Sequence, residues 1–282
     1  MPKPGNGLVC TERTPRVVTA RKLLRRASRE RAGRFLAEGS QAVHASLAAA
    51  LDGAARVFEL FATVEALGRH PDLDGQARSL GVPVTLVTDR AAAALSETVT
   101  PQGLIAVCGL LYVPVERALA GSPRLVVVLV EAADPGNVGA LIRVADAAGV
   151  DAVLLAGDGV DPHNGKSVRS SAGSLFHLPL APVRDVSAAL DECRQRDLRL
   201  LAATAGGELD LDTASDDGTL ARASAWLFGN EAHGLPDEVV AAADHRVSVP
   251  IHGRAESLNL ATAAAVCVYA SARAQRLERG RF

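Results

Sequence analysis

The chain has 282 residues, 48% of them hydrophobic, so it is long enough to bury one large core or two ordinary ones. Its formal net charge of −2 excludes a uniformly basic nucleic-acid-binding protein. No apolar run approaches the ~18–20 residues of a membrane span, and the start has no apolar signal segment. We therefore expect a cytoplasmic protein that does not contact a membrane.

The near-neutral total charge conceals a basic segment near the start. Residues 16–34 contain eight basic residues and one acid, Glu30. Residues 1–123 carry 15 basic and 11 acidic residues (+4), and residues 124–282 carry 15 and 21 (−6), which together give −2. A local basic excess is typical of a surface that contacts phosphates, although a solvated helix has the same pattern.

The first part of the chain predicts a small α/β unit. The expected elements are a basic helix over residues 21–31, a strand over 34–38, a turn at Gly39-Ser40 that caps a helix over 41–51, and strands over 56–61, 83–88 and 103–111. The Pro- and Gly-rich residues 113–123 predict a linker. The expected domains are thus residues 1–112 and 124–282.

The second part predicts a parallel sheet. Residues 125–130 are a continuous β-branched and leucine run, as in a strand that is buried on both faces. Further strands are expected over residues 152–156, 198–204, 225–228 and 246–249, and helices over 138–148, 186–196, 236–243 and 258–277. Strands that alternate with helices indicate a doubly wound α/β domain, in which ligands bind at the carboxyl ends of the strands.

The loop after the first of these strands contains the first candidate site. Asn137 is expected just before the helix, and Arg143 lies within it, among alanine, leucine, isoleucine and valine. An arginine there needs a reason, because an unpaired buried guanidinium is costly. The alternatives are a pair with a core carboxylate, a position in solvent, or a functional role.

Two nucleotide-binding patterns fail here. The first turn lacks the G-x-G-x-x-G of a dinucleotide fold. Gly165-Lys166-Ser167 resembles the end of a P-loop, but that motif needs a glycine where this chain has Val160. The segment from Lys166 to Arg169 instead predicts a helix start that either holds RNA phosphates or is merely a capped surface helix.

Two later loops also follow predicted strands. Glu231 lies just after residues 225–228, where Gly229 allows a ligand to come close. Ser257 is expected to cap the long C-terminal helix, with Asn259 in its first turn. The four cysteines (Cys10, Cys108, Cys193, Cys267) have no metal-ligand spacing, and we expect no metal site.

Three short segments, in this order after a buried strand, resemble the SpoU/TrmH family of RNA ribose 2′-O-methyltransferases, within the SPOUT superfamily. They are Asn137-x-Gly-x-x-x-Arg143-x-Ala, Gly229-Asn-Glu231-x-x-Gly-Leu, and Pro250-Ile251 followed by Ser257-Leu-Asn259-Leu-Ala. The likeness is strongest to members that methylate ribosomal RNA, including the thiostrepton-resistance type. Residues 35–39 and 100–104 are similar to the family's L30e-like substrate-binding domain.

The resemblance implies a fold, a cofactor and a partner. It implies a deep trefoil knot near the C-terminus, S-adenosyl-L-methionine as cofactor, and a homodimer in which each subunit completes the other's site. The implied cofactor contacts fall on Thr204, Gly229, Ile251 and Leu260.

It also implies roles in the transfer of a methyl group to a ribose 2′-hydroxyl. Arg143 would act as base or as the cation that stabilises the forming alkoxide. Asn137 and Asn259 would position Arg143 and the ribose, and Glu231 would orient Arg143 or a loop of the partner. The full expected catalytic set is Arg143, Asn137, Glu231, Ser257 and Asn259.

The RNA is expected to be structured, with 23S ribosomal RNA favoured. A tRNA 2′-O-methyltransferase and a non-catalytic RNA-binding protein of the same fold are the alternatives. The expected RNA contacts are Arg21, Lys22, Arg25, Arg26, Arg29, Lys166 and Arg169.

Overall fold

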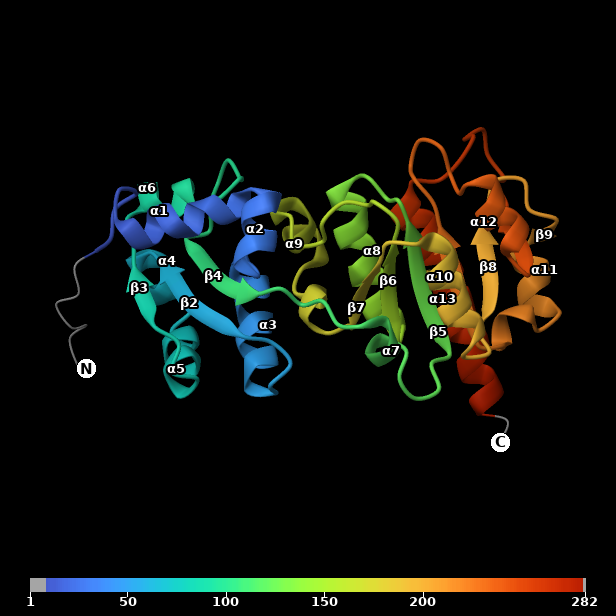
Figure 1. The fold of residues 1–282 in the computed structure, drawn as a ribbon, viewed down its shortest axis with the longest axis horizontal. Coiled ribbons are helices and arrows are strands. Elements are labelled where there is room, and N and C mark those ends of the chain that lie inside the picture. Colours follow the sequence, from blue (N-terminus) through green and yellow to red (C-terminus); the bar gives the residue numbers. More distant parts are fainter. Residues whose placement is uncertain (1–8, 281–282) are drawn as a thin grey trace. The chain divides into compact units, whose positions relative to one another are not determined.

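The computed structural model describes residues 9–280, and these form two compact units (Figure 1). Residues 9–111 and 161–177 make up the first unit, and residues 112–160 and 178–280 the second. Residues 161–177 were expected in the second domain but fold with the first. Residues 113–123, expected as a linker, belong to the second unit and contain helix α7 (Val115–Ala118), where Ala118 and Leu119 are buried.

A four-stranded sheet in the order β1-β4-β2-β3 is the base of the first unit. Its strands are β1 (Arg34–Glu38), β2 (Val57–Ala62), β3 (Val84–Leu86) and β4 (Leu104–Gly109). β4 runs antiparallel to β1 and β2, whereas β3 runs parallel to β2. All four predicted strands are present, with ends shifted by two residues at most.

Helices cover this sheet on both faces. They are α1 (Pro15–Arg21), the 3-10 turn η1 (Lys22–Leu24), α2 (Arg26–Ala32), α3 (Ser40–Leu51), α4 (Val64–Arg69), α5 (Asp72–Ser79), α6 (Asp89–Ala94), α9 (Gly165–Ser171) and the 3-10 turn η2 (Ser174–Phe176). α1, η1 and α6 share one core with strand residues such as Leu36 and Ile105. Ser40 begins α3 and does not cap it, because Gly39, at φ +96°, holds the cap position.

The predicted basic helix over residues 21–31 is wrong, because the chain is extended at Arg25 (φ −95°, ψ 132°). The break leaves the carbonyl groups of Leu23 and Leu24 without the bonds of a continuous helix. Both accept hydrogen bonds from Nη1 of Arg29, at 3.0 and 2.9 Å. It also allows Leu23 to pack in the core while Arg29 points elsewhere.

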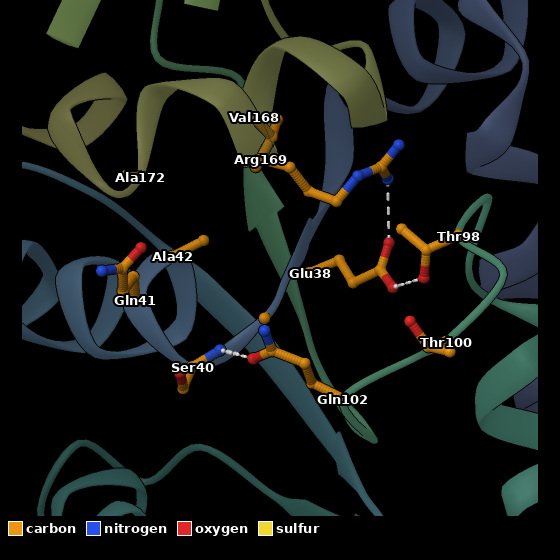
Figure 2. A pocket seen from close by; sticks show the side chains of 11 residues that line it. Glu38, Ser40, Gln41, Ala42, Thr98, Thr100, Gln102, Val168, Arg169 and Ala172 are labelled. Atoms are coloured by element: carbon orange, nitrogen blue, oxygen red, sulfur yellow. Dashed lines mark hydrogen bonds and ion pairs between the residues drawn. The ribbon is translucent and has the colours of Figure 1, made fainter.

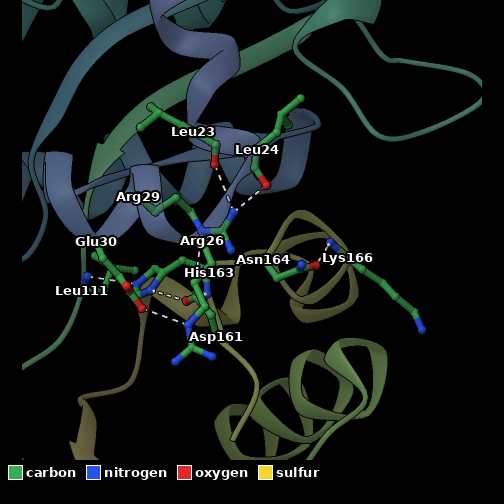
Figure 3. Close-up of polar contacts among 10 residues, drawn as sticks. All are labelled: Leu23, Leu24, Arg26, Arg29, Glu30, Leu111, Asp161, His163, Asn164 and Lys166. Carbon is green, nitrogen blue, oxygen red and sulfur yellow. Dashed lines mark hydrogen bonds and ion pairs between the residues drawn. The ribbon is translucent and has the colours of Figure 1, made fainter.

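Arg29 is the centre of a buried polar network that joins α2 to residues 161–163 (Figure 3). Its Nε lies 2.7 Å from Oδ2 of Asp161, and both side chains are less than a tenth exposed. His163 accepts the Leu111 N–H through Nε2 at 3.1 Å, so its Nδ1 carries the proton and faces Asp161 Oδ1 at 3.2 Å. Arg29 is therefore structural, and its predicted RNA contact is wrong.

The same contacts determine the protonation states of Asp161 and His163. Burial raises the pKa of Asp161, but the hydrogen bond from His163 and the charge of Arg29 outweigh it, so the pKa lies below its ordinary value. Burial lowers the pKa of His163, which keeps the ring neutral. A neutral histidine between a carboxylate and a backbone N–H satisfies every member of the network.

The second unit contains a parallel sheet of seven strands, in the order β7-β6-β5-β10-β8-β11-β9. The strands are β5 (Leu125–Val130), β6 (Ala152–Ala156), β7 (Leu180–Val183), β8 (Arg199–Ala203), β9 (Leu209–Asp210), β10 (Ser224–Phe228) and β11 (His245–Ser248). The predicted parallel sheet is confirmed, and β5 and β6 have the predicted bounds. β7 and β9 were not predicted. β10 lies between β5 and β8, so the strand order changes direction there.

Side chains alternate between the two faces of this sheet. The helices are α7, α8 (Pro135–Ala148), α10 (Val186–Arg194), α11 (Leu211–Asp216), the 3-10 turn η3 (Thr219–Ala221), α12 (Asp237–Ala242) and α13 (Leu260–Arg279). Val126, Val128 and Leu227 pack with α7, α10 and α12. α8 and α13 contact each other, and on the side of α13 the indole N–H of Trp226 donates to Ser271 Oγ at 2.9 Å.

No helix within residues 9–280 combines the length and the apolar character that a bilayer span requires.

Replacement of Arg29 by Met is expected to destabilise the first unit by about 3–5 kcal/mol, because it leaves the buried Asp161 carboxylate without its cation. Arg26 is the matched control, because it forms an ion pair with Glu30 in which both side chains are exposed. Arg26→Ala is expected to lower the free energy of unfolding by about 1 kcal/mol or less. Urea unfolding monitored by circular dichroism measures both. Equal effects of the two substitutions would contradict the structural role of Arg29.

Candidate functional site

A cavity of about 460 Å³ lies at the carboxyl edge of the parallel sheet. Its lining comes from the ends of β8, β10 and β11, from the start of α8 and from the segment that leads into α13. The strand order changes direction beside it, between β5 and β8, which is where open α/β sheets bind ligands. The predicted site residues on its wall are Asn137, Thr204, Gly229, Glu231, Ile251, Ser257, Asn259 and Leu260.

Three of these side chains form a continuous line of hydrogen bonds. Asn137 Nδ2 donates to Glu231 Oε1 at 3.0 Å, and Asn259 Nδ2 donates to Asn137 Oδ1 at 2.9 Å. Glu231 also accepts the backbone N–H groups of Ala133 and Asp134, at 3.0 and 3.1 Å. Residues 94 to 122 positions apart in the chain are thereby held together.

These bonds fix the charge of Glu231. Its partial burial raises the pKa, but the N–H of Ala133 and the amide of Asn137 outweigh this effect, so the pKa lies below its ordinary value. Glu231 is therefore a carboxylate at neutral pH and holds the loop before α8. It was expected to orient Arg143 or a loop of the partner; within one chain its bonds go to Ala133, Asp134 and Asn137 and not to Arg143.

The starts of α8 and α13 differ from the predicted ones. α8 begins at Pro135, with Asp134 as its cap, so Asn137 lies inside the first turn and not before the helix. Asn259, not Ser257, caps α13: its Oδ1 accepts the N–H groups of Ala261 and Thr262, while Ser257 is an exposed residue on the cavity wall. An aspartate directly before a proline is a cap signal that sequence reasoning missed.

The backbone of the protein itself requires a glycine at position 229. A Cβ atom there would lie 2.2 Å from the carbonyl carbon of Gly234. The loop folds back because Asn230 and Gly234 exchange backbone hydrogen bonds at 2.9 and 2.8 Å. The side chain of Asn230 holds the loop further, as its Nδ2 donates to the carbonyl of Glu131 at 2.9 Å. Asn230 was not predicted, although it lies between two residues that were.

Thr204 has a buried side-chain hydroxyl group. Its Oγ1 has no hydrogen-bond partner within residues 9–280. Thr204 and Ala205 follow β8 on the cavity wall, which also includes apolar groups such as Val247 and Ile251. A cavity of this size, whose wall combines apolar side chains with fixed polar groups, is suited to a small organic ligand.

Arg143 is exposed on α8 and is not part of the cavity wall of its own chain. Among residues 9–280 its side chain makes no hydrogen bond or ion pair. This exposure rules out a pair with a core carboxylate within one chain and is compatible with both a position in solvent and a functional role. Asn137 and Asn259 therefore do not position it within one chain.

A second cavity of about 390 Å³ lies in the first unit (Figure 2). The buried carboxylate of Glu38 accepts hydrogen bonds from Ser96, from Thr98 at 3.1 Å and from Arg169 at 2.9 Å. Gln102 Oε1 accepts the N–H of Ser40 at 2.9 Å, so its amide nitrogen remains on the wall. Arg169 is thus part of an ion pair between α9 and β1.

The other expected RNA contacts lie on the surface of this unit. Arg21, Lys22, Arg25 and Arg26 are exposed, as is Lys166 at the start of α9. Phosphate contacts require such accessible cations, so these five retain the chemistry expected of them.

The fold and the cavity define a class: an α/β protein with a parallel sheet and a ligand site at its strand ends. The sequence profile described as the SpoU rRNA Methylase family matches residues 124–269, more than half of the chain, and the MRM3-like substrate binding domain matches residues 14–106. The chain belongs to the SpoU rRNA methylase family, and the resemblance inferred from the sequence is confirmed.

Individual relatives agree with this assignment. The chain is 33% identical over 189 residues to the 23S rRNA (guanosine(2553)-2′-O)-methyltransferase RlmP of Bacillus subtilis, covering 67% of this chain and 72% of the relative. The AdoMet-bound rRNA methyltransferase from Sinorhizobium meliloti matches with a TM-score of 0.80 and 27% identity, over 95% and 98% of the two chains. The SpoU methyltransferase AviRb from Streptomyces viridochromogenes in complex with AdoMet matches with a TM-score of 0.79 and 30% identity, over 94% and 100%.

Replacement of Gly229 by Ala is expected to destabilise the second unit by about 1–3 kcal/mol or more and to weaken S-adenosylmethionine binding, since the added methyl group forces the Asn230–Gly234 loop away. Gly253 has open space around it, so Gly253→Ala is the matched control and should leave stability unchanged. Thermal unfolding and calorimetric titration measure the two effects. An unaltered melting temperature in Gly229→Ala would contradict the packing argument.

Proposed function

We propose that this protein transfers the methyl group of S-adenosyl-L-methionine to a ribose 2′-hydroxyl of ribosomal RNA, with 23S RNA as the favoured substrate. Membership of the SpoU rRNA methylase family supports the reaction class. The single observation that carries the assignment to this chain is the cavity at the strand ends, where the buried Thr204 Oγ1 lacks a partner beside the Glu231–Asn137–Asn259 line.

The residues of this cavity fit the proposed cofactor. Thr204 offers a hydroxyl group to a polar part of the ligand, and Ile251 and Leu260 offer apolar surface. Gly229 contributes backbone at the floor of the cavity. When bound, S-adenosylmethionine supplies an electrophilic methyl group on a positively charged sulfur.

The ribose hydroxyl must lose its proton as the new bond forms, because it is a weak nucleophile at neutral pH. Arg143 is a permanent cation, and its proposed role is to stabilise the oxygen as negative charge develops there. Asn137 and Asn259 hold each other and Glu231, so they present fixed amide groups at the cavity edge. Such fixed groups favour alignment of the hydroxyl with the methyl group, which supplies much of the rate.

The position of Arg143 supports a homodimer in which two chains share each site. Arg143 faces solvent and lies outside the cavity wall of its own chain, so its catalytic role requires a second chain. The proposed knot would be formed by the segment that returns from β11 through Ile251 and Ser257 to Asn259. Support comes from the bond of Asn259 to Asn137, which brings this segment back to α8.

The first unit is the proposed RNA-binding domain of L30e-like type, as its match to a substrate-binding domain suggests. Arg21, Lys22, Arg25, Arg26 and Lys166 would contact phosphates. Arg169 would act indirectly, by its ion pair with Glu38 at the edge of the cavity in Figure 2.

Methylation of the ribose can be tested with tritiated S-adenosylmethionine and total RNA. We expect the label in alkali-resistant dinucleotides, because a 2′-O-methyl group blocks cleavage at that step. Label in mononucleotides would mean base methylation, and no label would favour a protein that only binds RNA.

In the same assay, Arg143→Ala is expected to lower the rate by about 10²–10³-fold, the usual cost of one charge-stabilising donor, with cofactor affinity nearly unchanged. Arg117, an exposed arginine on α7, is the matched control and its replacement by Ala should leave the rate unaltered. Near-normal turnover of Arg143→Ala would refute its catalytic role.

The double substitution Arg21→Ala, Arg25→Ala is expected to weaken RNA binding. In a plot of the logarithm of the binding constant against the logarithm of the salt concentration, the magnitude of the slope should also fall by ~0.7–0.9 for each phosphate that the variant no longer neutralises. Arg78, an exposed arginine of α5, provides the control. Filter binding over a range of salt concentrations measures the slope. An unchanged slope would show that the basic segment does not bind RNA phosphates.

A further inference from the structure

Two imidazoles and a carboxylate meet on the surface of the first unit, in a cluster to which neither the family nor the proposed reaction gives a role. His44 lies on α3, His70 follows the last residue of α4, and Asp72 is the first residue of α5. One potential ligand atom from each lies within 4.8 Å of the others. α3 and α5 contact each other.

The hydrogen bonds of His44 leave one nitrogen available. Its Nδ1 lies 2.7 Å from the carbonyl oxygen of Ser40, which can only accept, so Nδ1 carries a proton. In the neutral ring Nε2 is then a lone pair, and it lies 3.0 Å from Oδ2 of Asp72. Two lone pairs at this distance repel each other unless a cation, either a proton or a metal ion, lies between them.

The contact with Ser40 is the arrangement that metal-binding histidines adopt. Such a histidine usually donates its other N–H to a backbone carbonyl or a carboxylate, which fixes the ring and its tautomer. Asp72 is oriented in a similar way, since its Oδ2 accepts a bond from Gln76 Nε2 at 3.2 Å. Both ligands are therefore held before any ion arrives.

His70 completes the set. Its ring lies edge-on to that of His44, with centroids 5.4 Å apart and planes at 67°. Neither ring nitrogen of His70 has a hydrogen-bond partner within residues 9–280. Pro71 separates His70 from Asp72 and restricts the turn that carries them. A ring without polar partners beside a second imidazole and a carboxylate is available to an ion.

The donor atoms select the kind of ion. Imidazole nitrogens favour zinc and neighbouring transition metals, whereas magnesium and calcium prefer oxygen ligands. Three protein ligands leave a fourth tetrahedral position for water. Three of the four cysteines do not compete, because burial raises the pKa of Cys108, Cys193 and Cys267 to about 12 and keeps their thiols protonated.

We propose that His44, His70 and Asp72 bind one zinc ion, which joins α3 to the turn between α4 and α5. The site lies entirely within the first unit and does not depend on the proposed methyl transfer. It would stabilise the first unit, because an ion that binds only the folded chain shifts the unfolding equilibrium.

Calorimetric titration of the EDTA-treated full-length protein with zinc chloride, under reducing conditions, tests this proposal. We expect one zinc ion per chain and a rise in melting temperature. His44→Ala and His70→Ala should each weaken binding about tenfold or more, since even removal of a residue that only orients a ligand costs about 10–100-fold. His252, an exposed loop histidine outside the cluster, is the matched control, and His252→Ala should bind zinc as the wild type does.

Several outcomes would overturn the proposal. Wild-type protein that binds no zinc would show that His44 and Asp72 form an ordinary ion pair with a protonated imidazole. Equal affinity in His44→Ala, His70→Ala and wild type would place the zinc elsewhere. With cobalt as a probe, an intense near-ultraviolet thiolate band would assign the metal to a cysteine, whereas weak visible bands alone fit nitrogen and oxygen ligands. Asp72→Asn preserves the shape of the side chain, so it tests the loss of the carboxylate ligand without the risk of misfolding that the alanine variants carry.

Discussion

The hydrogen-bonded line from Glu231 through Asn137 to Asn259 is the interaction on which the candidate site depends. Asn137 lies in the first turn of α8, whereas Glu231 and Asn259 come from two later segments and also accept backbone N–H groups, before α8 and at the start of α13. Glu231 holds the loop before α8, and Asn259 caps α13. The parallel sheet brings three loops to one edge, but these side chains determine how the loops are arranged there.

The local sequence pattern was sufficient to predict the central strands of the second unit. β5 and β6 are runs of branched apolar residues with clear ends, and the structure has them at the predicted residues. β9 has two residues and β7 contains a proline, so neither has a strand signal of its own and both depend on pairing with a neighbour. The cap of α13 was missed for a related reason. Ser257 and Asn259 are equally good caps by type, and the bond of Asn259 to Asn137, far away in the chain, favours the second.

Burial of polar groups was the least predictable feature. Arg29 belongs to a run of basic residues that otherwise face solvent, and its partner Asp161 lies 132 positions later. No periodicity distinguishes Arg29 from Arg25 or Arg26. The cluster of His44, His70 and Asp72 is equally hidden from a search based on cysteine spacing, because turns between short helices bring these residues together. Arg143 is the opposite case: its place in the motif was evident, whereas its exposure depends on which face of α8 meets α13.

Residues 161–177 give the chain a discontinuous domain organisation. The polypeptide leaves the first unit after Leu111, returns to it at Asp161 and leaves again after His177. A fragment that stops at Leu111 would lack the partner of Arg29 and the arginine that pairs with Glu38. Recombination between relatives that exchanged only the N-terminal stretch would therefore mismatch one buried ion pair and one partly buried ion pair. The first unit is thus encoded by two separate pieces of sequence, and the second lies inside the stretch that matches the methylase profile.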